Sequence, residues 1–309
     1  MSELAQPQPM LATQVRRAHR QSTVAIVVRV IIYAVLIVAA LSMLVPFVWM
    51  MFTSLKPEES IFDMPPKVFT LEYTLTHYVR ALTRGKFNLY FVNSMIVATT
   101  ATVLNVLLNA MAGYAFARLR WRLRETFFII VLAVMMLPGL IALIPTFLIV
   151  KWTPFAGGNN WMGQGGIGWL DSYAGLILPS IGNGFYVFLL RQFFQTLPSE
   201  LEDAARVDGA SEAGIFWRII MPLSSAVLAV VAIFSFQSVW NDFLWPLVIV
   251  QSDRMRTVQL GLTLFQSQHR VEWGVLMAGT TIATLPTILL FLLAQRYFVQ
   301  GIALTGIKG

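Results

Sequence analysis

Long apolar runs alternate with shorter polar segments along almost the whole chain. A helix rises 1.5 Å per residue, so about 17–25 apolar residues cross the roughly 30 Å hydrocarbon core of a bilayer. Six runs reach or somewhat exceed that length, and they cover residues 24–52, 89–116, 126–150, 173–194, 222–250 and 274–298. The pattern therefore predicts an all-α membrane protein with six transmembrane helices.

The composition agrees with a membrane protein and argues against a soluble domain, a nucleic-acid-binding protein and a metal-binding protein. Of the 309 residues, 57% are hydrophobic and 12% are charged, whereas soluble domains average about 45–50% apolar and about 25% charged residues. The net charge of +7 comes from Lys and Arg at the ends of apolar runs, which argues against nucleic-acid binding. The chain has no cysteine, and His19, His77 and His269 lie in separate segments, so no metal site is expected.

The arginines predict which side of the membrane each loop occupies. The tail of residues 1–23 and the loop after the second run are strongly basic, with Arg16, Arg17, Arg20, Arg118, Arg120, Arg122 and Arg124. Short loops rich in Lys and Arg stay in the cytoplasm. We therefore expect residues 1–23 to be a disordered cytoplasmic tail and both termini to be cytoplasmic. The loop 251–273 then lies outside, although its arginines favour the opposite side.

The first run is too long for the apolar centre of a secretory signal, which spans about 7–15 residues. It is therefore interpreted as an uncleaved first span. Ala39, Ala40 and Ser42 leave a cleavage site as the less favoured alternative.

The stretch "LEDAARVDGASEAGIFWRIIMP", residues 201–222, crowds charges between the fourth and fifth runs. Ser199 and Glu202 have capping-box spacing, which predicts a helix that begins at Glu200. A glycine such as Gly209 can end such a helix in the left-handed conformation, and a second helix is expected from Ser211 into the fifth run. The result would be either a lever joined to a span or an amphipathic helix that merely lies at the headgroups.

One face of the first of these helices carries small residues. Leu201, Ala204, Ala205 and Asp208 follow the i, i+3, i+4, i+7 spacing of a single helix face. The two alanines would let another surface approach closely.

Within the same stretch, Asp203-Ala204-Ala205, Gly209, Ile219 and Met221-Pro222 resemble the signature cytoplasmic loop of permease subunits in bacterial ABC importers. Asp replaces the family's Glu and Met replaces its Leu, so charge and apolarity are kept. The stretches "MMLPGLIALIPTF", "WNDFLWPL", "MRTVQLGL" and "TGIKG" are similar to the carbohydrate branch, the maltose-type inner subunit. The chain thus resembles the inner membrane component of a binding-protein-dependent transport system.

The resemblance implies a type I ABC importer permease fold over residues 24–309, with a coupling loop at about 197–221, in a bacterial inner membrane. It implies that a set of residues in this loop docks on a cytoplasmic ATPase subunit: Leu201, Glu202, Asp203, Ala204, Ala205, Asp208, Gly209 and Ala210. It also implies that the last four residues reach between two ATPase subunits: Gly306, Ile307, Lys308 and Gly309. A frayed terminus is the plainer interpretation of those four.

The partners implied are a second homologous permease subunit, which would form a heterodimer with this chain, and a pair of ATPase subunits that hold Mg-ATP. An extracytoplasmic solute-binding protein and membrane lipid complete the set. No cofactor is expected in this chain itself.

Polar residues inside the runs mark a candidate translocation path. Ser235, Ser238 and Asp242 share one face of the fifth run, and Asn241 lies beside that face. Polar groups in hydrocarbon should face a partner helix or a wet cavity. For Asn105 and Asn109 of the second run, hydrogen bonding between helices is the favoured interpretation. A salt bridge to an outer-loop arginine would explain Asp242 equally well.

Two further features have more than one interpretation. Pro138 and Pro145 should break or kink the third run, either for packing or to line a cavity. The Gly-rich loop of residues 151–172 could be an outer lid, a dock for a binding protein or a solvated connector.

The predicted function is therefore that of a permease subunit in an ATP-driven importer of a sugar or sugar-like solute. The sequence has no Gly-x-x-x-x-Gly-Lys-Ser/Thr phosphate loop, so ATP would be hydrolysed by another polypeptide and this chain is not expected to be an enzyme. The alternative is a secondary transporter driven by an ion gradient, which relies on intramembrane carboxylates or broken helices. The solute itself is not encoded in any recognisable motif.

Overall fold

The computed structural model describes residues 10–65, 69–70, 72–84, 86–266 and 271–305, and within these ranges the regular structure is helical. The α-helices are α1 (Met10–Leu55), α2 (Thr76–Arg84), α3 (Phe87–Ala117), α4 (Arg124–Met135), α5 (Gly139–Lys151), α6 (Tyr173–Ile177), α7 (Gly184–Thr196), α8 (Glu200–Val207), α9 (Glu212–Ile215), α10 (Met221–Leu223), α11 (Ser225–Trp240), α12 (Leu244–Ile249), α13 (Val258–Leu262) and α14 (Trp273–Thr305). Short 3₁₀ turns are η1 (Glu58–Ser60), η2 (Leu178–Ser180), η4 (Asp253–Met255) and η5 (Thr263–Phe265), and η3 (Phe216–Ile220) is a π-helical turn.

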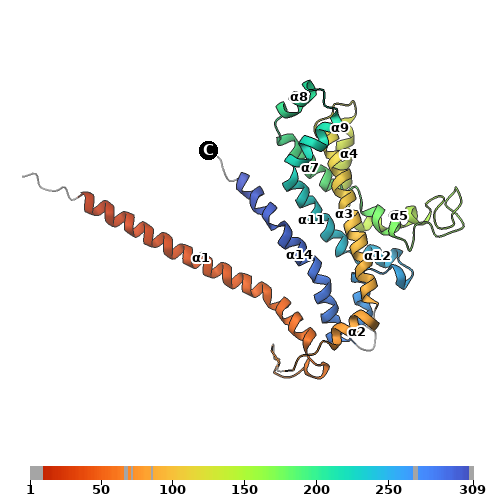
Figure 1. Cartoon of the computed structure of the whole chain (residues 1–309), viewed down its shortest axis with the longest axis horizontal. Coiled ribbons are helices and arrows are strands. Elements are labelled where there is room, and N and C mark those ends of the chain that lie inside the picture. Colours follow the sequence, from red (N-terminus) through yellow and green to blue (C-terminus); the bar gives the residue numbers. More distant parts are fainter. Residues whose placement is uncertain (1–9, 66–68, 71, 85, 267–270, 306–309) are drawn as a thin grey trace, which may run out of the picture.

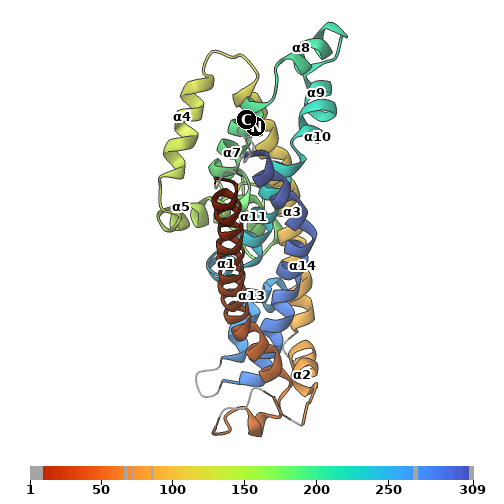
Figure 2. The same ribbon diagram turned by 90° about the vertical axis from the view of Figure 1, so that its left-hand side faces the viewer.

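Helix α3 runs through the middle of the bundle, with α7 and α11 packed along it (Figure 1). Helix α8 lies at one end of the bundle and α2 at the opposite end (Figure 2). Helix α1 begins, and α14 ends, toward the α8 end (Figure 2). The hydrophobic stretch of α1 leaves the bundle at an angle, and its most apolar window is entirely unburied within this chain (Figure 1).

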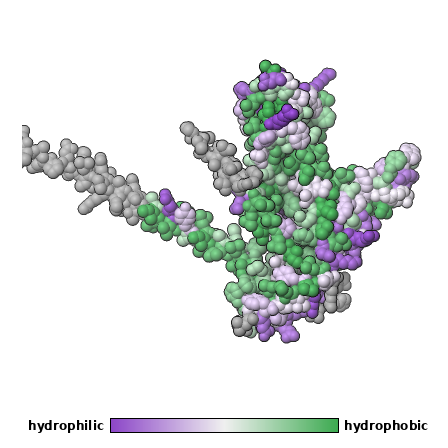
Figure 3. All heavy atoms as spheres, in the orientation of Figure 1, coloured by the Kyte–Doolittle hydropathy of each residue, from purple (hydrophilic) through white to green (hydrophobic). Residues whose placement is uncertain are grey.

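Three helices are long and apolar enough to cross a bilayer on their own, namely Ala25–Leu55, Phe87–Ala117 and Trp273–Gln295. Three further pairs meet the same test only if each bent pair counts as one span. Hydrophobic residues cover the middle of the bundle, and hydrophilic residues gather toward the α8 end and the opposite end (Figure 3). The first, second and sixth predicted runs thus lie in continuous helices, whereas the other three do not.

The third run bends by 106° between α4 and α5. Pro138 stands at the junction as the residue before α5, with an extended backbone, because proline cannot continue the hydrogen-bond ladder of α4. Pro145 lies inside α5 and does not end it. The expected break is confirmed at Pro138, and its size directs α5 away from the bundle axis (Figure 1).

The fifth run was expected to span residues 222–250 and to continue the helix that starts at Ser211, and both the continuity and the far end are wrong. Before α11, the segment Glu212–Leu223 is bent by 81° from the helix that follows. At the other end α11 stops at Trp240, and Asn241 and Asp242 lead into the separate α12. The fourth run is also divided, with a 45° bend between Tyr173–Ser180 and α7.

The basic tail differs from the expectation as well. Helix α1 begins at Met10, so the tail from that residue onward is helical rather than disordered. The stretch after Pro9 is rich in Leu, Ala, Gln and Arg, which are strong helix formers, and it contains no glycine or proline that would end the helix.

A close contact between α3 and α7 fixes the α8 end of the bundle. A Cβ atom at Gly113 would lie 2.9 Å from the Cβ of Leu190, so only glycine allows the two helices to approach this closely. Around this contact lies a hydrophobic core that includes Leu190, Phe194, Ile215 and Val231, all of them fully buried. The core supports the ends of α3 and α7 from which α8 projects.

Candidate functional site

Helix α8 has the predicted start and the predicted bend. It begins at Glu200, ends at Val207, and is followed by Gly209 with φ at +82°. This is the left-handed region that glycine adopts readily. Ser211 then caps α9 by accepting a hydrogen bond from the main-chain N–H of Gly214 at 3.2 Å.

The predicted capping box at the start of α8 is wrong. Ser199 has a helical backbone conformation, φ −69° and ψ −24°, and its side chain makes no capping hydrogen bond. The Glu202 side chain does not turn back to the helix start because two arginines hold it elsewhere. The main-chain carbonyl of Ser199 accepts hydrogen bonds from the main-chain N–H groups of Glu202 and Asp203, at 3.0 Å each, as in an ordinary first helical turn.

The residues predicted to dock on a partner divide into an outward and an inward group. Most are solvent-exposed within this chain: Leu201, Asp203, Ala204, Asp208, Gly209 and Ala210. Ala205 is half-buried against the hydrophobic core, and Glu202 is almost completely buried. Val207 is 88% exposed and was not predicted, although an isolated valine on a charged helix, three residues after Ala204, could have marked it.

Glu202 is the centre of a charged network at the base of α8. Its Oε1 lies 3.0 Å from Nε of Arg118 at the end of α3, and its Oε2 lies 3.2 Å from a guanidinium nitrogen of Arg206. The Glu202 side chain is only 2% exposed and that of Arg118 only 13%. The guanidinium of Arg118 also donates to the main-chain carbonyls of Phe194 and Leu197, where α7 ends.

Arg206 extends the network to α9. Its guanidinium contacts Glu212 and Asp203 at 2.8 Å each, and the hydrogen bond to Glu212 raises the pKa of Arg206 above its usual value. Glu212 in turn accepts a hydrogen bond from the hydroxyl of Tyr114 on α3 at 2.9 Å. The base of α8 is therefore joined to α3, α7 and α9 by polar contacts.

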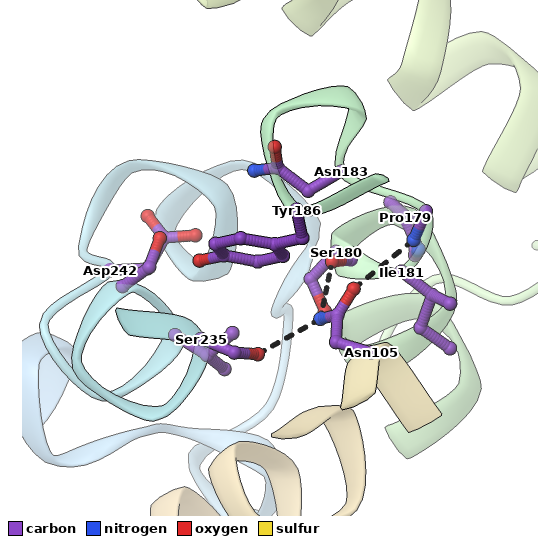
Figure 4. Close-up of a pocket in the computed structure, with 11 residues that line it drawn as sticks. Asn105, Pro179, Ser180, Ile181, Asn183, Tyr186, Ser235 and Asp242 are labelled. Atoms are coloured by element: carbon purple, nitrogen blue, oxygen red, sulfur yellow. Dashed lines mark hydrogen bonds between the residues drawn. The ribbon is translucent and has the colours of Figure 1, made fainter. Parts of the chain in front are cut away.

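A second candidate site is a cavity of about 260 Å³ between α3, α7 and α11. Its lining includes Asn183, Tyr186, Ser238 and Asp242, and the ring of Tyr186 extends across it toward Asp242 (Figure 4). Such a volume is slightly below the roughly 300–1,000 Å³ of typical ligand pockets. Asn183 and Tyr186 were not predicted, although Asn183 stands between two glycines in the middle of the fourth run, a signal that could have marked this segment.

Asn105 holds the inner wall of this cavity. Its amide nitrogen donates to Ser235 Oγ and to the Ser180 carbonyl, at 3.0 Å each (Figure 4). Its carbonyl oxygen accepts from the main-chain N–H of Gly182 at 3.2 Å. The interpretation of Asn105 as a residue that joins helices is thus confirmed, while Asn109 hydrogen-bonds back to Asn105 within α3.

The four predicted path residues are only partly brought together. Ser235, Ser238 and Asp242 line the cavity, but Asn241 does not and instead accepts a hydrogen bond from Gln259 at 3.3 Å. Asp242 lies beyond the end of α11, where its carboxylate accepts the main-chain N–H of Trp245 at 3.3 Å. It therefore orients the turn into α12 as well as facing the cavity.

The predicted tail contacts Gly306, Ile307, Lys308 and Gly309 lie outside the described residues. Within the part of the chain that the structure describes, no group of three or more His, Cys, Asp or Glu side chains could hold a metal ion.

The model of the family described as "Binding-protein-dependent transport system inner membrane component" matches residues 109–304. This range includes α8, its charged network and the cavity-lining residues other than Asn105. The chain belongs to this family.

Curated relatives of this permease are similar over most of its length. The lactose transport system permease protein LacG of Rhizobium radiobacter is 34% identical over 269 residues, 87% of this chain and 93% of the relative. The arabinooligosaccharides transport system permease protein AraQ of Halalkalibacterium halodurans is 35% identical over 250 residues, 81% of this chain and 82% of the relative.

The fold of the permease is also found among solved structures. A bacterial ABC transporter involved in the import of the acidic polysaccharide alginate superposes with a TM-score of 0.75 at 23% identity, covering 87% of this chain and 95% of that chain. At this identity the likeness concerns the fold alone. The permease is thus a multi-pass inner-membrane component with an ABC importer fold.

Proposed function

We propose that this permease carries a sugar or sugar-like solute, delivered by an extracytoplasmic binding protein, through the membrane at the expense of ATP hydrolysed by a separate subunit. Membership in a binding-protein-dependent family supports the delivery step. The names of its relatives, which mention lactose and arabinooligosaccharides, support the solute class.

The proposed topology has six spans, with both termini and α8 in the cytoplasm. Three continuous helices and three bent pairs account for six crossings. The arginine-rich segment between α3 and α4 supports a cytoplasmic location for the α8 end, since basic loops are retained there. The start of α1 and the end of α14 lie toward the same end (Figure 2).

The observation that carries the proposed ATP coupling is the division of α8 into two sides. Leu201, Ala204 and Val207 face solvent, whereas Glu202 is buried and ion-paired to the bundle. A partner that binds the exposed apolar side can displace this short helix. The ion pair at the base of the helix then transmits the displacement to the bundle. We assign the exposed side to an ATPase subunit, and Gly306–Gly309 to the contact between two such subunits.

A second permease subunit completes the proposed passage. The most apolar stretch of α1 contains no residue that is buried within this chain, and apolar residues of α5, such as Leu140 and Ile144, are also highly exposed. The cavity lined by Ser238 and Asp242 would form part of the solute path from this side. Its carboxylate, amide and phenol groups can exchange hydrogen bonds with solute hydroxyls.

Reconstitution tests the proposal directly. In proteoliposomes that contain this chain, its partner permease, the ATPase subunits and the binding protein, uptake should require internal ATP and persist in the presence of a protonophore. The chain purified alone should hydrolyse no ATP. Uptake that survives ATP removal and collapses with the protonophore would instead support an ion-gradient transporter.

A further inference from the structure

We propose that Arg118 is the positioning residue through which movement of α8 enters α3 and α7, with its ion pair to Glu202 as the joint. This inference rests on the proposed coupling role of α8. The inference adds that the covalent connections before and after α8 are not the main route by which its movement reaches the bundle.

The covalent connections of α8 are poorly suited to carry force. On its C-terminal side the chain turns at Gly209, where an added Cβ would meet nothing within 4 Å, so the elbow is not braced by neighbouring atoms. On its N-terminal side Leu197 has an extended backbone and is followed by Pro198. Most α8 side chains are exposed, so the helix has little packing to replace those connections.

Arg118 supplies the missing connection because a single guanidinium reaches three elements. Arg118 itself belongs to the end of α3, and its Nε lies 3.0 Å from the Glu202 carboxylate of α8. Its Nη2 donates to the Phe194 carbonyl at 2.6 Å and to the Leu197 carbonyl, at the end of α7. Any displacement of Glu202 must therefore pull on α3 and α7 together.

Burial separates this ion pair from the others at the same end. The Arg206–Asp203 pair has side chains that are 38% and 67% exposed, and pairs of this kind contribute little. Glu202 and Arg118 are 2% and 13% exposed, which places them in the class whose rupture leaves an uncompensated buried charge. An ion pair that transmits movement must stay intact while α8 moves. The buried Arg118–Glu202 pair meets that requirement better than the exposed Arg206–Asp203 pair.

The Arg206–Glu212–Tyr114 chain is a second attachment of α8 to the bundle. Arg206 is shared between α8 and α9, so this chain mainly fixes the elbow between them. It does not reach α7. Loss of Arg118 should therefore separate α8 from α7 even when Arg206 is intact.

The test uses the full reconstituted complex and measures solute taken up per ATP hydrolysed, together with co-purification of the ATPase subunits. Arg118→Met and Glu202→Gln should bind the ATPase subunits normally and lower the uptake-to-ATP ratio roughly tenfold, within the 5–150-fold range of allosteric couplings. Matched controls are Arg120→Met, which removes an exposed arginine of the same loop, and Glu200→Gln, which removes an exposed carboxylate of α8. Both should retain the wild-type ratio.

An unchanged ratio in Arg118→Met, or an equal loss in the two controls, would overturn the inference. If Arg118→Met does not assemble, Arg118→Lys decides, because it keeps a charge near Glu202 but cannot reach all three partners at once. A lowered ratio in Arg118→Lys supports the joint, and a wild-type ratio contradicts it.

Ala204→Trp, on the exposed side of α8, separates this inference from the proposed function. If Ala204→Trp blocks ATPase binding while Arg118→Met transports normally, only the inference fails. If Ala204→Trp also transports normally, the coupling role of α8 fails with it.

Discussion

Asn105 of α3 and Ser235 of α11 are joined by a buried hydrogen bond of 3.0 Å, 130 positions apart in the sequence. The same Asn105 amide also binds the Ser180 carbonyl and the Gly182 N–H, so one side chain holds α3, α11 and the segment before α7 together. This arrangement fixes one wall of the cavity while Ser238 and Asp242 face its interior.

The first prediction concerns the stability of that wall. Asn105→Ala should lower the free energy of unfolding by about 1–3 kcal/mol, since it leaves buried polar groups without partners. Ser235→Ala should cost only about 0.6 kcal/mol, the average for interhelical hydrogen bonds in membranes. Thermal unfolding of the detergent-solubilised protein measures both. Ser238→Ala is the control and should leave the midpoint unchanged, whereas equal midpoints for all three variants would contradict the role of Asn105.

The second prediction concerns the cavity as part of the solute path. Ser238→Trp should fill much of its roughly 260 Å³ and abolish uptake, while leaving ATPase assembly intact. The matched control is Phe234→Trp, one turn earlier on α11, where the side chain is 43% exposed and does not line the cavity. Wild-type uptake by Ser238→Trp in proteoliposomes would remove this cavity from the path.

The third prediction concerns the elbow after α8. Gly209 has φ at +82° with open space around it, so an added side chain costs only backbone strain. We expect Gly209→Ala to lose about 1–2 kcal/mol of local stability and to weaken uptake. Gly209→Asn should be closer to wild type because asparagine adopts the left-handed conformation more easily.

Gly209→Asp should abolish transport while leaving membrane insertion intact. A Cβ atom at this position meets no atom of this chain within 4 Å, so we attribute the expected loss of transport to the surface that docks there. Uptake and insertion are measured in the same cells, and normal uptake by Gly209→Asp would count against a docked partner at the elbow.

The relation between sequence and structure differs from one part of the chain to another. The continuous helices α3 and α14 could be predicted closely because their apolar runs have no internal break that stops the helix. The division of the fifth run was missed, although its signals were present: Asn241 and Asp242 favour a helix end, and Pro246 lies just beyond. Hydropathy averaged along the run does not reveal this break, because the segments before and after it are both apolar.

The charged network could not be predicted for a different reason. The spacing of Ser199 and Glu202 favours a local capping box, but a tertiary contact with Arg118 competes for the same carboxylate and prevails. Arg118 precedes Glu202 by 84 positions. No feature of the sequence around either residue identifies the two as partners. That Leu201, Ala204 and Asp208 share one side of α8 could be predicted because helical spacing is local. The attachment of α8 to the bundle could not, because it depends on residues far apart in the sequence.

The fourth prediction concerns the pH dependence of stability through Asp171. Asp171 lies in the connection before α6, and its carboxylate accepts the main-chain N–H groups of Gln251 and Ser252 at 3.0 Å each. Burial acts to raise its pKa, but these hydrogen bonds hold the pKa below its usual value of 3.8. A lowered pKa means that the stabilisation is complete above that value and is lost as the pH falls through the folded-state pKa.

Between pH 5 and pH 8 this carboxylate should therefore leave the unfolding midpoint unchanged. Asp171→Asn should lower stability at neutral pH by about 1 kcal/mol, because a charged acceptor is lost. Thermal unfolding as a function of pH measures this, with the exposed Asp63→Asn as control. A neutral-pH midpoint for Asp171→Asn equal to that of the wild type would show that the contact contributes nothing.

The most direct test of the coupling account is cross-linking from the exposed side of α8 in the assembled complex. The chain contains no cysteine, so Val207→Cys and Ala204→Cys each introduce a single reactive site in this subunit. The account predicts that both cysteines cross-link to the ATPase subunit, that the yield changes when ATP is added, and that an impermeant thiol reagent outside the cell does not reach them. Cysteines that react from outside, or that form no cross-link to the ATPase subunit, would contradict the account.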